Sequence, residues 1–186
     1  MENEGGIKII ENLGLKDKHR IESWLKEARS LSKDDYFKKM IFYWISFNCY
    51  YGKRYRNPWT DAKDSKTGGE PGKIRTVLNH IRREELGERE SERFLNENHI
   101  DIEIMINHMS PEYYCEQVSK FQNHLKNKHY RTACVELIIL IEKVRNRLFH
   151  GAKTYDLPHY GNKEVLPSCC NILNNLMTKL GFPDKL

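Results

Sequence analysis

The sequence predicts an all-α protein, a helical bundle with loop and helix elaborations. Apolar residues recur at intervals of three and four through most of the chain, which is the period of a helix with one buried face. The two-residue alternation of a half-buried strand occurs in one segment, residues 100–106. With 186 residues, 39% of them hydrophobic, the chain can bury one core, and we expect a single domain over residues 1–186.

Two helices are expected before a long polar loop. The first covers residues 19–31, and the second covers residues 35–51 and is apolar on most sides, as a central helix is. The first has an apolar stripe at Ile21, Trp24, Leu25 and Ala28. Gly52 is the expected end of the second helix. Residues 53–72 are polar, with two prolines and three glycines, and therefore predict a loop.

Helical periodicity resumes after this loop, over residues 73–86 and again over residues 88–98. The next segment, IDIEIMI at residues 100–106, alternates apolar and polar side chains and is compatible with one short strand.

Three further helices are expected in the last third of the chain, over residues 111–127, 131–150 and 163–180. Proline suits the first turn of the first of these, where its missing N–H is not needed. Within the last helix, Pro167 predicts a bend or a restart, and Gly181 predicts the end.

The charge balance is moderately basic. Lysine and arginine number 31 against 26 aspartate and glutamate, which gives +5, and eight histidines can add to it at mildly acid pH. This excess is compatible with a polyanionic partner such as RNA, provided that folding gathers the positive charge on one face.

The expected compartment is the cytoplasm. No apolar run approaches the roughly 20 residues of a membrane span, so no membrane partner is predicted. The first residues, MENEGG, are acidic and polar, the reverse of a signal peptide. Five cysteines without CxxC spacing predict free thiols in a reducing compartment.

Motifs for nucleotide, metal or nucleophile chemistry are incomplete. The string TGGEPGK has one residue too few between its first glycine and its Gly-Lys pair for a phosphate-binding loop. His124 and His129 are five residues apart, so on a helix they would diverge rather than share a face as metal ligands do. We therefore expect no metal and no cofactor.

The remaining candidate site is the string EKVRNRLFHGAK, which begins at Glu142. On a helix, Asn146 and His150 are neighbours on one face, and Glu142 lies one turn earlier on the same stripe. Arg145 lies on the adjoining edge, at the rim of a buried helix, where fraying would let it and His150 point at solvent. A guanidinium suits phosphate, and an imidazole exchanges protons near neutral pH. On spacing alone, both side chains could instead cap the helix end and interact with its dipole.

Arg145-Asn146-x-x-x-His150 resembles the R-polar-x-x-x-H signature of the HEPN superfamily, small all-α domains named for higher eukaryotes and prokaryotes nucleotide binding. The surrounding LIEKVRNRLFHGAK and the upstream FYWISFNCYYG are similar to the Apea-like branch, in which an aromatic helix packs under the motif helix. The likeness is close over these two stretches, and elsewhere it is limited to helical character.

The resemblance implies a HEPN-like up-and-down helical bundle with loop and helix elaborations. It also implies a metal-independent endoribonuclease that acts as a toxin or in anti-phage defence. The ribose 2′-hydroxyl would attack the adjacent phosphodiester and leave a 2′,3′-cyclic phosphate and a 5′-hydroxyl. His150 would transfer protons, Arg145 would clamp the phosphate, and Asn146 would orient His150 or contact the phosphate. The family further implies a homodimer whose two motifs face each other, and a cognate antitoxin or nucleotidyltransferase as a possible partner.

Five other residues complete the expected site. Glu142 and Asn48 would support it, Asn48 because an amide on an otherwise apolar helix needs a partner and the motif helix is the natural candidate. Arg147, Lys143 and Lys153 would contact RNA, although such charged runs are also found on ordinary solvated surfaces.

Two other functions remain open from the sequence. The first is a non-catalytic HEPN module that binds RNA, a nucleotide or a protein partner. The second is an adaptor in a larger assembly, which would predict exposed apolar surface on helices such as the last one.

Overall fold

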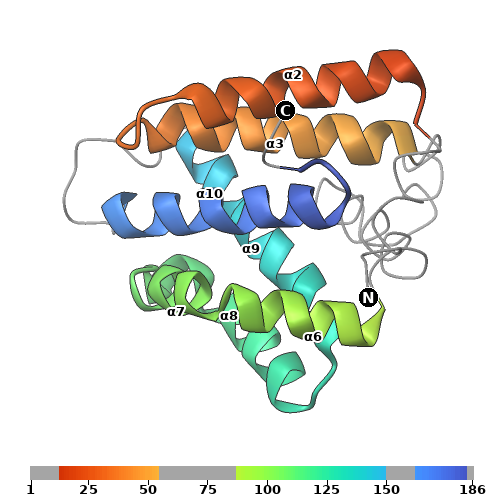
Figure 1. Cartoon of the computed structure of the whole chain (residues 1–186). Helices are drawn as coiled ribbons and strands as arrows, with labels where there is room; N and C mark the ends of the chain where they lie inside the picture. Colours follow the sequence, from red (N-terminus) through yellow and green to blue (C-terminus); the bar gives the residue numbers. More distant parts are fainter. Residues whose placement is uncertain (1–12, 55–86, 150–161, 184–186) are drawn as a thin grey trace, which may run out of the picture.

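The computed structural model describes residues 13–54, 87–149 and 162–183. Within these ranges the chain forms seven helices and no strand, so the all-α prediction is confirmed there. The helices are α2 (Leu15–Ser30), α3 (Tyr36–Arg54), α6 (Glu88–Glu97), α7 (His99–Asn107), α8 (Pro111–Lys126), α9 (Tyr130–Phe149) and α10 (Asn162–Lys179) (Figure 1).

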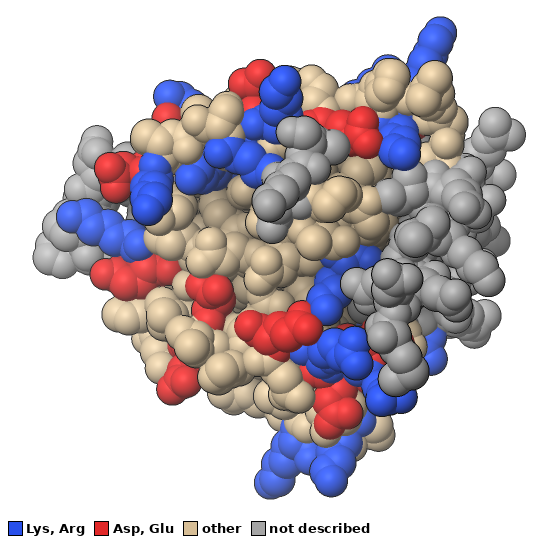
Figure 2. Space-filling view, viewed as in Figure 1, with Lys and Arg blue, Asp and Glu red and all other residues tan. Residues whose placement is uncertain are grey.

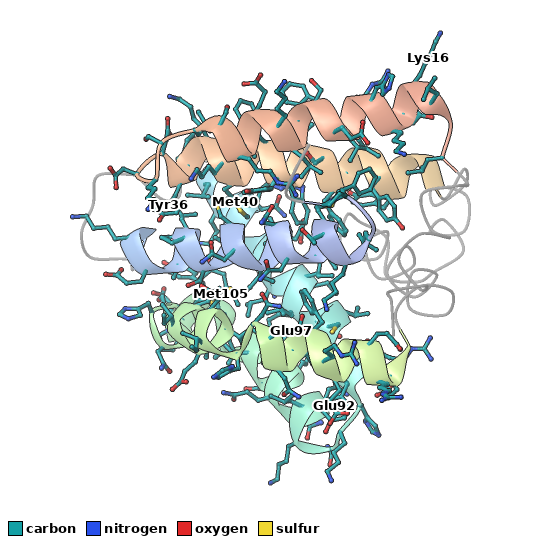
Figure 3. All side chains as sticks on the ribbon, in the orientation of Figure 1. Lys16, Tyr36, Met40, Glu92, Glu97 and Met105 are labelled. Carbon is teal, nitrogen blue, oxygen red and sulfur yellow. The ribbon has the colours of Figure 1, made fainter. Side chains whose placement is uncertain are left out.

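The helices pack around α9 and α10. α2 and α3 form an antiparallel pair, and α10 lies between α3 and α7 (Figure 1). Met40 of α3 and Met105 of α7 lie on opposite sides of α10 in Figure 3. α9 packs on α8 and α6 and passes steeply behind α10, which brings its last turns to α3.

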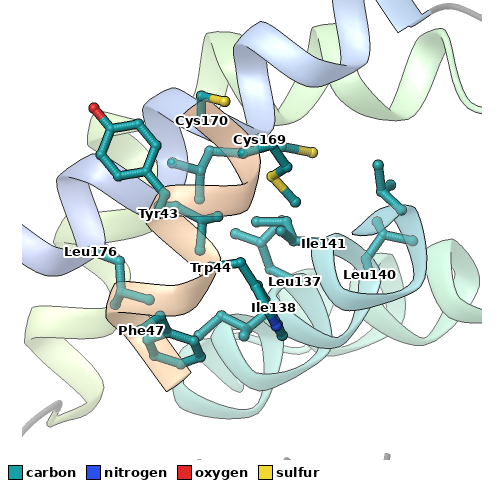
Figure 4. Close-up of a cluster of buried hydrophobic side chains, with 14 of the residues drawn as sticks. Tyr43, Trp44, Phe47, Leu137, Ile138, Leu140, Ile141, Cys169, Cys170 and Leu176 are labelled. Carbon is teal, nitrogen blue, oxygen red and sulfur yellow. The ribbon is translucent and has the colours of Figure 1, made fainter. Parts of the chain in front are cut away.

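The core is centred where α3, α9 and α10 meet. In Figure 4, Trp44 and Phe47 of α3 lie against aliphatic side chains of α9, and Leu176 of α10 closes the cluster. Every residue of α9 from Ala133 to Glu142 is buried, so this helix lies in the interior on all its sides. Each fully buried aliphatic side chain stabilises the fold by about 1.5–3 kcal/mol relative to exposure, which fixes the position of α9 firmly.

Residues 100–106 lie in helix α7, so the expected short strand is wrong. Ile102 and Met105 of α7 are buried three residues apart, as on one face of a helix, whereas Ile100 and Ile104 remain exposed. A strand would have turned all the isoleucines to one face. Burial of Ile102 together with Met105 requires the helical period, and that burial favours the helix.

Two expectations about helix limits differ from the structure. α3 continues through Gly52 to Arg54, and Gly52 does not adopt the positive φ typical of a helix end. α10 is one continuous helix through Pro167, so it does not restart there. The remainder of the expected loop, the helix expected at 73–86 and Gly151 lie outside the described residues.

The end of α10 is as expected and is held by α2. Gly181 has φ 99°, a left-handed conformation that side chains disfavour. Arg29 of α2 donates hydrogen bonds to the carbonyl oxygens of Phe182 at 3.1 Å and Pro183 at 2.8 Å. Its Nε also donates to Asn174 Oδ1 at 3.0 Å. This contact, here named the Arg29 clamp, ties α2, α10 and the turn after α10 together.

The cysteines are free thiols, as the sequence predicts. Cys134, Cys169 and Cys170 are buried, and burial raises the pKa of Cys134 to about 12. A thiol that stays protonated is unreactive, so Cys134 is a packing residue. Among the described helices, none has the length and apolar character that would let it cross a membrane.

Candidate functional site

The last turns of α9 carry the described part of the motif. Val144 and Leu148 are buried and anchor this end of the helix in the core. Of the expected site residues on this end of α9, Lys143, Arg145, Asn146 and Arg147 are partly exposed and Glu142 is buried. His150 and Lys153, also expected in the site, lie outside the described residues.

Glu142 and Asn146 are brought together as their spacing predicts. The Glu142 side chain is fully buried, and its Oε1 accepts a hydrogen bond from Asn146 Nδ2 one turn later. This bond fixes which way the amide of Asn146 faces. A buried carboxylate thus holds the second residue of the motif in one orientation.

Arg145 contacts two aromatic rings. Its Cζ lies 5.0 Å from the ring centroid of Trp44 on α3 and 5.6 Å from that of Phe149. Its Nη2 lies 4.0 Å from Glu142 Oε1, and 18% of the side chain is exposed. The expectation of a guanidinium pointing freely at solvent is therefore corrected: most of the side chain is buried, and the two rings attract its charge.

The polar atoms at the crossing of α3 and α9 are incompletely paired. Arg145 Nε, Trp44 Nε1 and Asn48 Oδ1 are buried, and none has a hydrogen-bond partner within the part of the chain that the structure describes. A hydrogen bond from the motif helix to the Asn48 oxygen, expected from the sequence, is thus not present there. Each such buried group costs about 1–3 kcal/mol, and such groups concentrate at functional sites.

Arg147 contacts a different helix from Arg145. Its Cζ lies 3.5 Å from the ring centroid of Tyr113 at the start of α8. Residues two apart on a helix point to opposite sides. The two arginines therefore do not merge into one basic patch, contrary to what their closeness in sequence suggests. Lys143 is partly exposed on the same helix end.

Sequence reasoning missed the three aromatic partners of these arginines. Phe149 follows Arg145 by one helical turn, so the rule for i, i+4 neighbours could have found it. Trp44 lies in the aromatic stretch FYWISFNCYYG. Its contact with Arg145 depends on how α3 crosses α9, which the sequence does not show. The same holds for Tyr113, which α8 brings to Arg147.

No three histidine, cysteine, aspartate or glutamate side chains within the described ranges gather as a metal site requires. His124 and His129 have ring centroids 6.0 Å apart. They do not diverge around one helix as expected, because α8 ends at Lys126 and the chain turns before His129.

The surface in Figure 2 shows acidic and basic side chains interspersed over the described part of one face. On this face the excess of basic residues forms no continuous single-sign patch. In this view α9 passes behind α10 and ends at α3, so the candidate site lies behind the helices at the front.

No known family model matches the chain, and the same negative result was obtained against curated proteins and against solved structures.

Proposed function

We propose that this chain is a metal-independent endoribonuclease of the HEPN type, acting as a toxin or in defence against phage. The proposal starts from the motif Arg145-Asn146-x-x-x-His150. The observation that supports it is the contact of the Arg145 guanidinium with the rings of Trp44 and Phe149, in a side chain that is still 18% exposed.

The proposed reaction needs proton transfers and charge stabilisation. A base removes the proton of the ribose 2′-hydroxyl, whose oxygen attacks the adjacent phosphorus, and an acid protonates the departing 5′-oxygen. An imidazole such as that of His150 can perform either step near neutral pH. In a homodimer, two copies of His150 could share these roles across a composite groove.

Arg145 would stabilise the negative charge that develops on the phosphoryl oxygens. A guanidinium already fixed by two rings needs little rearrangement when that charge appears, which is the condition for electrostatic stabilisation of a transition state. Asn146, oriented by Glu142, would support the imidazole or the phosphate. Lys143, Arg147 and Lys153 would add phosphate contacts outside the reacting group.

The test is RNA cleavage in EDTA by the wild-type chain and by three variants. We expect a cyclic phosphate product, about 100-fold or greater loss in His150→Ala and Arg145→Ala, and intermediate loss in Arg145→Lys, which keeps the charge without the planar fork. Exposed Arg20 on α2 provides the control Arg20→Ala. Circular dichroism melts separate lost chemistry from lost folding. Cleavage that is unchanged in these motif variants, or that requires magnesium, would contradict the proposal.

A two-fold homodimer is part of this proposal. Light scattering of the purified chain should give twice the monomer mass at working concentrations. A strictly monomeric chain that still cleaves RNA would remove the composite groove from the mechanism. An antitoxin or nucleotidyltransferase gene beside this one would favour the toxin function.

A second candidate function is a non-catalytic module that binds RNA, a nucleotide or a protein partner. The burial of most of the Arg145 side chain against Trp44 and beside the Glu142 carboxylate favours it, since such an arginine also stabilises the fold. RNA binding without product in the cleavage assay would select this function.

A further inference from the structure

We propose that Phe149 is a stacking platform for an unpaired nucleobase, next to a phosphate held by Arg145. The inference deepens the proposed function and rests on it, because it names single-stranded RNA as the substrate class of the same site. It starts from the exposure of the Phe149 ring at the end of α9.

The exposure of Phe149 differs from that of every other phenylalanine in the chain. All seven phenylalanines lie within the described ranges, and Phe149 is 54% exposed. The other six are buried or packed against the core: Phe37, Phe42, Phe47, Phe94, Phe121 and Phe182. A single exposed apolar side chain is ordinary on a protein surface. Phe149 is a candidate contact for a ligand because its exposed ring also lies against the guanidinium of the motif arginine.

The position of Phe149 suits stacking because its exposed ring lies next to the motif guanidinium. The Arg145 Cζ is 5.0 Å from the ring centroid of Trp44, which is almost completely buried, and 5.6 Å from that of Phe149, which is 54% exposed. A base that stacks on the exposed ring of Phe149 would therefore lie close to Arg145. A ribose separates a base from its phosphate by only a few ångströms, so one nucleotide could reach both Phe149 and Arg145.

Stacking on a side chain selects unpaired RNA. In a duplex each base is already stacked on both sides and its faces are not accessible, whereas a base in a loop or single strand can turn onto an aromatic ring. Every base has such a face, so the preference would be for structure rather than for sequence. The site would therefore act on loops and single strands.

The test measures binding of RNA that cannot be cleaved. Short RNAs carry 2-aminopurine at one position and a 2′-deoxyribose at the cleaved position, because removing the 2′-hydroxyl blocks the attack. Binding and fluorescence are followed in EDTA for the wild type, Phe149→Ala and Phe149→Trp. Ile100→Ala on α7 is the matched control, since Ile100 is a large apolar residue that is 62% exposed.

We expect quenching of 2-aminopurine at one position with the wild type and with Phe149→Trp. Phe149→Ala should lose the quenching and bind single-stranded RNA about 10-fold to 100-fold more weakly, the range given by base stacking on aromatic residues. Ile100→Ala should match the wild type. Binding of the corresponding duplex should be weak and equal in all four proteins.

Unchanged binding and quenching in Phe149→Ala would overturn the inference about Phe149. The proposed function is tested separately, by cleavage of all-ribose RNA by the wild type, and would stand if that RNA is cleaved. Loss of the dimer in Phe149→Ala, with normal quenching by the remaining dimer, would also overturn it and assign Phe149 to a subunit interface. Phe149-dependent quenching without cleavage of all-ribose RNA by the wild type would support the stacking site while contradicting the nuclease.

Discussion

Aromatic side chains contact both arginines in the last turns of α9, Arg145 and Arg147. Trp44 and Phe149 fix Arg145, and Tyr113 contacts Arg147. An arginine against a ring loses rotamer freedom and part of its hydration, and the ring's electrons offset part of that cost. The motif residues are therefore part of the packing as well as candidates for chemistry, and variants must be assayed for both.

Tyr114 provides a prediction about alkaline pH. Burial raises its pKa to about 12, against a smaller lowering effect of the Arg147 charge. Between pH 10 and 12 the unfolded chain releases this proton while the folded chain keeps it, so stability falls as pH rises. Urea unfolding should show a loss over this range that is smaller in Tyr114→Phe, by up to about 2 kcal/mol.

The baseline for this comparison is the difference between the two proteins at pH 8, where the hydroxyl is protonated in both states. A constant difference from pH 8 to pH 12 would show that Tyr114 titrates alike in the folded and unfolded chains.

Two local signals predicted helix limits correctly, whereas Gly52 did not end α3. Pro111 and the turn at Gly181 place the limits of α8 and α10 within a residue of the expected ones. α2 begins at Leu15, four residues before the expected start, and the Gly14 carbonyl accepts hydrogen bonds from the N–H groups of Asp17 and Lys18. Leu15 is exposed, so its turn carries no apolar periodicity and the sequence pattern could not reveal it.

The two faces of α7 predict opposite effects of the same substitution. Ile102→Asp places a charge among buried residues and should destabilise the chain by about 3 kcal/mol or more, whereas Ile100→Asp is at an exposed position and should change stability by less than about 0.5 kcal/mol. Thermal or urea unfolding measures both. Equal effects at the two positions would indicate the strand pattern, in which both isoleucines share one face.

At the scale of the whole molecule, the Arg29 clamp joins segments that are far apart in the sequence. Three hydrogen bonds connect α2 to α10 and to the turn that follows it. Phe182 in that turn is buried and its ring meets that of Tyr50 of α3 edge-on at 6.0 Å. The clamp thus fastens the end of the described chain to the first helical pair.

Removal of the Arg29 clamp should destabilise the fold as a unit. Arg29→Ala should lower the free energy of unfolding by about 2 kcal/mol, because hydrogen bonds of a charged donor are lost and two carbonyl groups need new partners. Arg20→Ala on the same helix serves as the control and should have little effect. If the two variants unfold at the same denaturant concentration, the clamp does not contribute to stability.

The sequence by itself determined the helical class, most helix limits and the Glu142–Asn146 pair, because these depend on periodicity, end signals and neighbours one turn apart. The tertiary structure decided that residues 100–106 are helical, that Arg145 contacts Trp44, and that Asn48 Oδ1 has no hydrogen-bond partner within the described chain. These outcomes depend on which faces of distant helices meet and on the apolar area buried there, and a local pattern does not contain that information.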